Sequence, residues 1–342
     1  MTAIFTAVQQ ELASVGLSIG SSGLSHQRSV LNGGSNPIET SKTLFEDFRG
    51  IGVPEEMGGD GGSLVDLVIF IESLSRRIEP TSYVVHMAAL QVALGASLNI
   101  SHAVIGNELW SLGLCEKPGQ RWGEWECLIN EDEISAIKIG VPHATHCQSV
   151  VIAGADHRIA IVDQFLAKGR MSIDPSLEFG DIAVSSKPRE VGTQSSHALL
   201  RGALVVSAEL IGVARGALLS AAEYASIRQQ FGQFIGSFQG IAHLLADAFV
   251  ELEAAWNLVL YAAWALNESE ADAVISSHSA IAKSGSAAIY VTERCLQVFG
   301  GIGVTWEADA HLYIRRVLAL NSFLGGYSSH YRQTGKLLFA IK

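Results

Sequence analysis

The sequence predicts a mainly α-helical protein with a small β domain near the middle of the chain. Apolar residues recur with helical spacing in the N-terminal third and again in four blocks of the C-terminal part. Between these regions, from Trp110 to about Ala198, short β-favouring runs alternate with turn residues. All seven prolines lie at or before Pro188, so the four C-terminal blocks lack the residue that most often ends a helix.

The N-terminal third is predicted to be helical. Ser63 is a suitable N-cap for an amphipathic helix, and Pro80 follows the end of that helix. The segment from Ser18 to Ser41 is rich in Ser, Gly and Asn and is predicted to be a loop. The expected helices cover residues 3–15, 44–48, 64–78 and 84–96.

The middle of the chain predicts a small antiparallel β domain, and the C-terminal part predicts a four-helix bundle. Three domains are therefore expected, a helical one at 1–113, a β one at 114–198 and the bundle at 199–342. The expected strands cover residues 134–141, 149–153, 159–162 and 182–184. The helices of the bundle are expected near residues 199–230, 239–267, 271–299 and 309–340.

Composition narrows the possible functions. Of the 342 residues, 48% are apolar and 17% are charged, which leaves apolar surface for contacts with other subunits. The net charge of −11 and the lack of a basic run argue against nucleic-acid binding. The four cysteines have wide spacings without a metal-like pairing, so we expect reduced thiols and no metal site.

Neither a membrane span nor a signal peptide is expected. No apolar run reaches the roughly 18–20 uncharged residues that a span requires. The longest, Ala203–Leu219, contains Glu209 and Arg215. The first residues lack the charged and apolar regions of a signal peptide. We therefore expect a cytoplasmic protein.

One motif covers Arg228 to Asp247 and reads RQQFGQFIGSFQGIAHLLAD. It is predicted to join two helices through a corner that contains glycines, with the second helix beginning near Gln239. Arg228, Gln230 and Gln239 would then surround one bend. A guanidinium beside amides and free helix-terminal N–H groups suits a phosphate-bearing ligand. The alternative is a capped helix corner with a solvated arginine.

A second motif lies some sixty residues further on. It reads QVFGGIG from Gln297 to Gly303 and WEADAHLYIRR from Trp306 to Arg316. In order and spacing, the two motifs together resemble the C-terminal helical domain of the acyl-CoA dehydrogenase family. The sequence GVPEEMGG at Gly52–Gly59 is similar to the V-P-E-x-x-G-G segment of the same family. The resemblance is strong over residues 201–320, fair over 44–95 and poor between about 115 and 200.

The resemblance implies a fold and a chemistry. Family members have a helical N-terminal domain, a β middle domain and a C-terminal bundle, in the order predicted above. They remove hydrogens from the α and β carbons of an acyl-CoA thioester, with a carboxylate as base and the flavin of FAD as hydride acceptor. In the family the two motifs touch the pyrophosphate and adenosine half of an FAD held mainly by a neighbouring subunit. By matched position the contacts are Arg228, Gln230, Phe231, Gln239, Gln297, Gly300 and Gly301, unless these residues serve only the packing of helix pairs.

The middle domain departs from the family pattern. Where the family usually shows a T-E-P-x-x-G-S-D-like segment, this chain retains Glu116 and Pro118 with Lys117 between them, and the hydroxyl-bearing residues are absent. The strand that often places a tryptophan against the flavin has no aromatic residue at 138–143. We therefore expect that the chain does not hold the isoalloxazine ring well by itself.

The catalytic base is also missing from both family locations. The loop that often reads Y-E-G-T is Leu324–Tyr327 here and has no carboxylate, and the alternative location near Gly202 lacks Glu as well. Glu209 lies on the same face of that helix and is the remaining candidate. A buried structural Glu bonded to a neighbouring helix is the favoured interpretation. His330 is a second candidate base, although a partly exposed histidine at a helix start is the simpler interpretation.

Three further residues have alternative roles. Arg201, at the start of the first bundle helix, either meets a CoA phosphate or is solvated. Asp309 and His311 are only two residues apart and so point to different sides of a helix. Capping by Asp309 explains them better than a metal site.

These observations lead to one hypothesis. The chain is a subunit of a heteromeric acyl-CoA dehydrogenase and lacks the catalytic base. A longer paralogous partner would supply the catalytic Glu and most of the acyl-CoA site, and this chain would complete the shared FAD site. The resemblance makes a steroid side-chain CoA thioester a plausible substrate and an electron-transfer flavoprotein the expected acceptor. Two alternatives stay open: a self-sufficient homotetrameric dehydrogenase that uses Glu209 or His330, and a non-catalytic structural or regulatory subunit.

Overall fold

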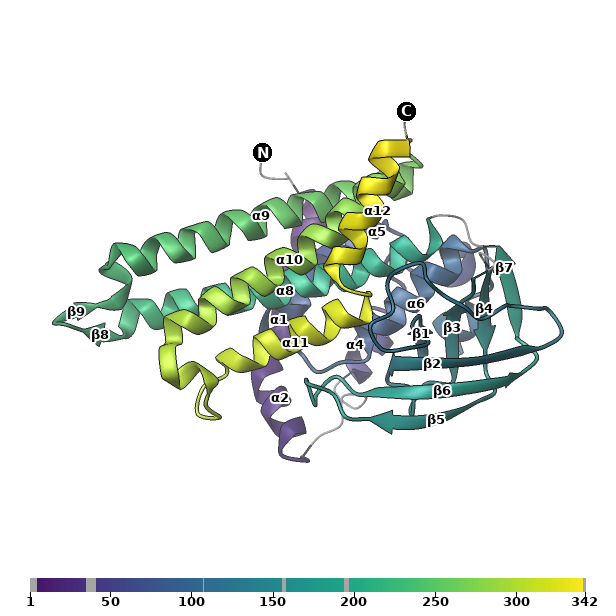
Figure 1. Ribbon diagram of the computed structural model, residues 1–342, viewed down its shortest axis with the longest axis horizontal. Coiled ribbons are helices and arrows are strands. Elements are labelled where there is room, and N and C mark those ends of the chain that lie inside the picture. Colours follow the sequence, from purple (N-terminus) through teal and green to yellow (C-terminus); the bar gives the residue numbers. More distant parts are fainter. Residues whose placement is uncertain (1–4, 35–40, 107, 156–157, 194–196, 341–342) are drawn as a thin grey trace.

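The computed structural model describes residues 5–34, 41–106, 108–155, 158–193 and 197–340. Short helices come first along the chain, two small sheets follow, and long helices come last. Figure 1 shows the sheets at one end of the molecule, with the long helices reaching away from them toward the other end. The predicted mainly α class with a small β region is confirmed. The domain boundaries stay a prediction, and the first strand already begins at Trp110.

Six helices precede the sheets in the described residues. Ser63 caps the long apolar one, because its Oγ accepts a hydrogen bond from the Asp66 N–H at 3.2 Å and the Asp66 carboxylate accepts one from the Ser63 N–H at 2.7 Å. The helices are α1 (Ala7–Ile19), α2 (Gly23–Leu31), α4 (Lys42–Asp47), α5 (Leu64–Leu74), α6 (Tyr83–Gly95) and α7 (Ser101–Val104).

The loop predicted from Ser18 to Ser41 is wrong over its first half, which forms a 3-10 turn and α2; residues 35–40 lie outside the described residues. The glycines that suggested a loop instead permit close packing. A Cβ at Gly20 would overlap the Leu74 carbonyl oxygen, and one at Gly23 would overlap that of Arg77. Tertiary contact with the end of α5 therefore overrides the local propensity.

The middle of the chain forms two sheets. One has the order β1-β3-β4-β7 and the other β2-β6-β5. The pairings among β2 to β7 are antiparallel, as predicted, whereas the unpredicted strand β1 pairs with β3 in parallel. The strands are β1 (Trp110–Gly113), β2 (Ile134–Pro142), β3 (Ser149–Ala153), β4 (Arg158–Val162), β5 (Phe165–Arg170), β6 (Phe179–Ser186) and β7 (Glu190–Thr193).

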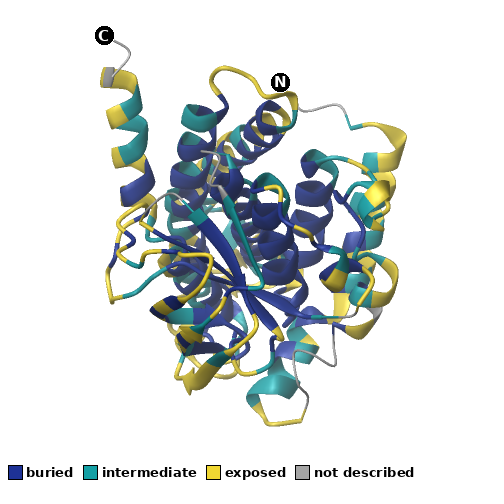
Figure 2. Cartoon of the chain, turned by 90° about the vertical axis from the view of Figure 1, so that its right-hand side faces the viewer, coloured by how far each residue is buried: buried dark blue, intermediate teal, exposed yellow. Residues whose placement is uncertain are grey.

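The C-terminal part contains three long helices and two shorter ones. The single fourth helix predicted at 309–340 is wrong, because Gly325 and Gly326 adopt positive φ angles of 76° and 78° and separate two helices. The helices are α8 (Ala198–Ile227), α9 (Gln239–Glu268), α10 (Ala273–Phe299), α11 (Ala310–Phe323) and α12 (Tyr327–Ala340). Figure 2 shows α12 standing out from the body of the molecule.

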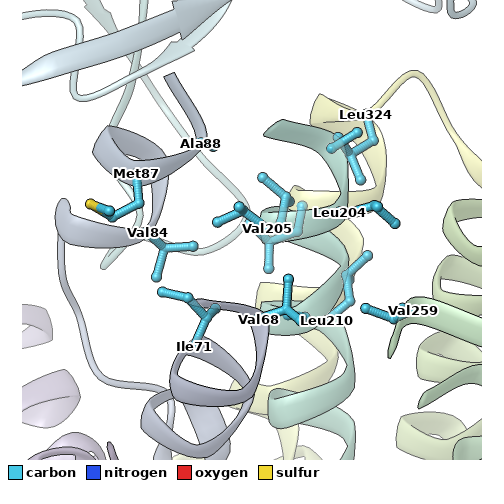
Figure 3. Close-up of a cluster of buried hydrophobic side chains, with 14 of the residues drawn as sticks. Val68, Ile71, Val84, Met87, Ala88, Leu204, Val205, Leu210, Val259 and Leu324 are labelled. Atoms are coloured by element: carbon cyan, nitrogen blue, oxygen red, sulfur yellow. The ribbon is translucent and has the colours of Figure 1, made fainter. Parts of the chain in front are cut away.

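Helix α8 lies at the centre of the main core. Figure 3 shows Leu204 and Val205 of α8 among Val68 of α5, Val84 of α6 and Val259 of α9, and all five side chains are buried. This packing joins the N-terminal helices to the bundle. Because this packing fixes the direction of α8, the first motif at the end of α8 lies away from the sheets.

Two helices, α8 and α9, are long and apolar enough to cross a membrane. In the folded chain, 89% of the apolar window of α8 and 50% of that of α9 are buried. On α9 the buried residues include Trp256, whereas Trp264 is 43% exposed. A core helix accounts for α8, and the free face of α9 suits a contact with another subunit.

Candidate functional site

The first motif forms a two-stranded hairpin at the far end of the bundle. Strands β8 (Gln229–Gln230) and β9 (Gln233–Phe234) pair, and Figure 1 shows them at the tip opposite the sheets. The two turn residues, Phe231 and Gly232, have φ angles of 53° and 78°, as a type I′ turn requires. A phenylalanine is strained in this region, and its side chain is 94% exposed. Strain of this kind at an exposed aromatic residue is typical of a binding site.

Arg228 is fixed in its backbone but free in its side chain. Its N–H donates to Tyr224 at 2.9 Å, and its carbonyl accepts from Ile235 at 2.8 Å. Its exposed guanidinium has no ion pair or hydrogen bond within the described residues. The exposed side chain of Gln239, the first residue of α9, is equally without a partner there. Both groups are available to a ligand from outside the chain.

The second motif lies beside the first at the same end. Tyr224 of α8 stacks on Phe299 of α10 with ring centroids 4.5 Å apart, and α10 ends there. Gly300 has φ 64° and ψ −145°, a conformation restricted to glycine. Neither Gly300 nor Gly301 would bring a Cβ within 4 Å of any atom. Packing inside the chain therefore does not require glycine at Gly301, whereas close approach of a ligand to the backbone would.

All seven predicted cofactor contacts lie exposed in this region. They occupy the end of α8, the hairpin, the start of α9 and the end of α10. Packing of helix pairs within this chain does not explain them. Contact with FAD or with another chain stays a prediction.

A second candidate site is a cleft of about 670 Å³ between the β region and the α11–α12 junction. Its charged lining residues are Lys117 and Arg170, and the described lining contains no Asp or Glu. Lys117 pairs with Glu126, and Arg170 with Asp181 at 3.0 Å. These walls therefore supply no carboxylate that could take a proton from a carbon acid.

Glu116 has a structural role beside this cleft. Its carboxylate accepts from the buried Lys138 Nζ at 2.6 Å and from the N–H groups of Glu126 and Cys127 at 2.6 and 3.1 Å. Although burial raises the pKa of Glu116, these donors lower it to about 2. Gln120, in the same loop, is occupied by the Glu116 N–H and the Glu124 carbonyl. These side chains order the loop rather than face a ligand.

Comparisons with known proteins identify the relatives of this chain. A family model described as "Acyl-CoA dehydrogenase, C-terminal domain" matches residues 193–335. The acyl-CoA dehydrogenase FadE34 of Mycobacterium tuberculosis is 31% identical over 283 residues, which is 81% of this chain. The chain belongs to the acyl-CoA dehydrogenase family. It spans 38% of the length of FadE34.

Other relatives are covered more fully. The acyl-CoA dehydrogenase IpdE2 of the same bacterium is 27% identical over 269 residues, 77% of this chain and 74% of IpdE2. Butyryl-CoA dehydrogenase from Megasphaera elsdenii has a TM-score of 0.86 at 20% identity, over 99% of this chain and all of its own. A chain of the ChsE4–ChsE5 complex from M. tuberculosis has the same TM-score and identity over 99% of both chains. The structural likeness establishes the acyl-CoA dehydrogenase fold.

Glu209 lies in the interior of this family member, away from the cleft. It is 5% exposed, and its Oε1 accepts from Arg316 Nη1 at 2.8 Å. Arg316 also pairs with Asp174 and donates to Ser176 Oγ at 2.9 Å. The cavity beside Glu209 measures about 10 Å³, which is too small for an acyl group. The geometry fits the structural role, a buried Glu bonded to another helix.

His330 differs from the partly exposed histidine predicted. It is fully buried, with Nδ1 3.0 Å from His278 Nδ1 and Nε2 3.0 Å from the Leu324 carbonyl oxygen. Burial lowers its pKa, and the neighbouring His278 lowers it further. Trp122 covers it, with ring centroids 4.7 Å apart. A histidine so enclosed has no open side for a substrate.

Two more expectations are corrected. Asp309 is the N-cap of α11, but its side chain makes no capping bond and instead pairs with Arg28 at 2.6 Å. Arg201 is not solvated but largely buried, and its partners are Gln91 and Asn267. Among the described residues, no group of three or more His, Cys, Asp or Glu side chains is placed to hold a metal ion.

Several cleft residues were missed because they belong to no motif. Arg170 lies at the end of the unpredicted strand β5, and Asn321 lies in α11. The buried Lys138, which pairs with Glu116 beside the cleft, could have been identified from the sequence. It follows Ile134 and Ala136 at the inward-facing positions of β2, where a lysine requires a buried acceptor.

Proposed function

We propose that this chain is a subunit of a heteromeric acyl-CoA dehydrogenase that completes the FAD site of a catalytic partner and supplies no base of its own. The observation that carries the proposal is the cleft, whose described walls present Lys117 and Arg170 but no carboxylate. Abstraction of an α proton needs a base within hydrogen-bonding reach of that proton. Glu209 and His330 are enclosed elsewhere, so a partner must provide the base.

The end of the bundle fits the phosphate-bearing half of FAD. The Arg228 guanidinium would hold the phosphates, and the amides of Gln230, Gln239 and Gln297 would meet polar edges. Gly300 and Gly301 leave backbone open to a ligand. When bound, FAD supplies the hydride acceptor; the residues of this chain bind and orient it.

The relatives support association with a second subunit. The likeness to a chain of the ChsE4–ChsE5 complex supports association between unlike subunits. A further structural neighbour, described as a steroid acyl-CoA dehydrogenase variant, has a TM-score of 0.84 at 23% identity. A bulky steroid side-chain CoA is the substrate we infer, with an electron-transfer flavoprotein as acceptor in the cytoplasm.

Co-expression tests the proposal. The chain is purified alone and together with a longer paralogue from the same source, and flavin absorbance, native mass and turnover are compared. We expect no stoichiometric flavin in the chain alone and about one FAD for each pair of unlike chains in the complex. Stoichiometric FAD and full turnover from this chain alone would overturn the proposal in favour of a self-sufficient dehydrogenase.

The variant Arg228→Gln separates FAD binding from assembly. We expect the complex to form at unchanged native mass with at least about tenfold weaker FAD binding, because a charge-assisted contact is lost. Arg332→Gln, at an exposed arginine of α12, is the matched control. An unchanged FAD content in Arg228→Gln would favour the non-catalytic structural subunit.

A further inference from the structure

A cavity of about 450 Å³ lies where the N-terminal helices meet the bundle. Its walls come from the 52–64 segment, the C-terminal ends of α6 and α9, and the start of α8. None of its lining residues belongs to the cleft or to the predicted FAD contacts. The cavity is therefore separate from the proposed cofactor site.

Arg201 lies in the wall of this cavity and has no anionic partner among the described residues. Its Nε and Nη2 donate to Gln91 Oε1 at 3.1 and 2.7 Å, and its Nη1 lies 3.4 Å from Asn267 Oδ1. Gln91 is held in turn by a hydrogen bond from its Nε2 to the Gly52 carbonyl at 2.7 Å. Burial lowers the pKa of Arg201, and no nearby carboxylate offsets this. The guanidinium is thus oriented by neutral amides and keeps N–H groups to spare.

Four other arginines that extend into the interior are paired differently. Arg76, Arg189, Arg215 and Arg316 each have a carboxylate within 3.2 Å of a guanidinium nitrogen. Their partners are Glu72, Glu108, Asp163, Asp174, Glu209 and Glu253. A buried cation without such a partner carries an uncompensated desolvation cost. In this fold, Arg201 is therefore set up for an anion that the described chain does not provide.

The other residues that line the cavity indicate which kind of ligand would fit it. No Asp or Glu lines the cavity in the described residues. The nearby Asp66 carboxylate is already occupied by the Ser63 N–H and Oγ. Met57, Leu94 and Leu266 supply apolar side chains to the lining, and Arg201 and His197 are its basic residues. One charge beside an aliphatic surface matches a small monoanion with a short hydrocarbon body.

We propose that this cavity binds a small aliphatic carboxylate, with its carboxylate on Arg201 and its hydrocarbon body on Met57, Leu94 and Leu266. The guanidinium fork provides two parallel N–H donors for the two carboxylate oxygens. The Asn267 amide lies beside the same group and can orient it. This site does not depend on the proposed role of the chain in FAD binding.

Calorimetric titration of the purified protein with butyrate, its neutral isostere butyramide and inorganic phosphate tests the proposal. We expect saturable binding of one butyrate per chain and at least about tenfold weaker binding of butyramide, since the charge pairs with Arg201. Absence of saturable butyrate binding, or equal binding of butyramide, would overturn the proposal. Binding of phosphate alone would show that the cavity recognises a different anion and would also overturn it.

Two variants locate the bound anion. Asn267→Asp places a carboxylate beside Arg201 Nη1 without removing the arginine, and Arg201→Gln removes the cation. Both are expected to weaken butyrate binding by about tenfold or more, with Arg332→Gln as the unchanged control. Retention of wild-type affinity in folded Asn267→Asp would refute the role of Arg201, even if Arg201→Gln failed to fold.

Discussion

The substitution Glu209→Gln distinguishes a structural carboxylate from a catalytic one. Burial raises the pKa of Glu209, and the Arg316 guanidinium offsets part of that rise. A raised pKa means that the neutral carboxyl is more favoured in the folded chain than in the unfolded chain, and glutamine is its neutral isostere. Arg316 keeps its pair with Asp174, and a glutamine Oε1 can still accept its hydrogen bond. We therefore expect the free energy of unfolding near neutral pH to change by no more than about 1 kcal/mol.

The pH dependence follows from the same shift. Because the folded pKa of Glu209 lies above its unfolded value, its contribution to stability is fully present below the unfolded pKa and is lost as the pH rises through the folded pKa. Glu209→Gln should lack that decline. Glu209→Ala, which leaves a void and an unsatisfied Arg316 donor, should cost about 2–4 kcal/mol below the unfolded pKa of Glu209, where the wild type keeps its full contribution. The free energies of unfolding of the wild type, Glu209→Gln and Glu209→Ala are measured by denaturant unfolding across a pH series.

Turnover of the complex with the partner completes the test. A structural Glu209 predicts a kcat within about twofold of the wild type for Glu209→Gln, whereas loss of a catalytic base typically costs 10²–10⁴-fold. A loss of about a hundredfold or more at unchanged stability and FAD content would refute the reasoning and make Glu209 the base. Loss of stability in Glu209→Gln as large as in Glu209→Ala would refute the inference from the raised pKa.

Two further predictions concern the ends of the molecule. Gly301→Ala should leave the unfolding free energy of the chain within about 0.5 kcal/mol, since its Cβ meets open space, yet lower the FAD content of the complex. Gly300→Ala should cost about 1–3 kcal/mol as well, because of its φ of 64°; equal FAD content in both variants and the wild type would contradict the predicted contact. Glu116→Gln should destabilise the chain by about 1–3 kcal/mol at pH 7, because Lys138 loses its buried ion-pair partner. The lowered pKa of Glu116 means that this difference is present above its unfolded pKa and disappears as the pH falls toward 2, which a pH series of thermal melts would show.

Periodicity predicted the long helices well because each buries one continuous apolar face. The start of α9 at Gln239 and the end of α10 at Phe299 lie where the motifs indicated. The features that were not predicted share one cause: they depend on contacts between segments that are far apart in the sequence. The helix α2 depends on glycines packed against the end of α5, and the parallel pairing of β1 with β3 joins segments separated by β2. Neither contact leaves a local pattern in the sequence.

The candidate sites also divide into residues that a local sequence motif predicts and residues whose position depends on long-range contacts. The end of the bundle was predictable because its residues lie in two contiguous motifs that the fold brings together. The cleft was predicted only in part, since Arg170 and Asn321 lie outside the motifs. The burial of His330 was missed because it depends on Trp122, more than two hundred residues away along the chain.

The absence of a base at the α11–α12 loop is built into the backbone rather than into one side chain. Gly325 has a φ of 76°, and a Cβ there would lie 2.9 Å from the Trp122 N–H nitrogen. A glutamate at this position would have to adopt a left-handed conformation and displace the 120–125 segment that covers His330. Gln333 holds the same segment through a hydrogen bond to the Trp122 carbonyl at 3.2 Å. The packing of this loop thus fills the place of a base with backbone, which is the arrangement expected of a subunit whose partner performs the proton transfer.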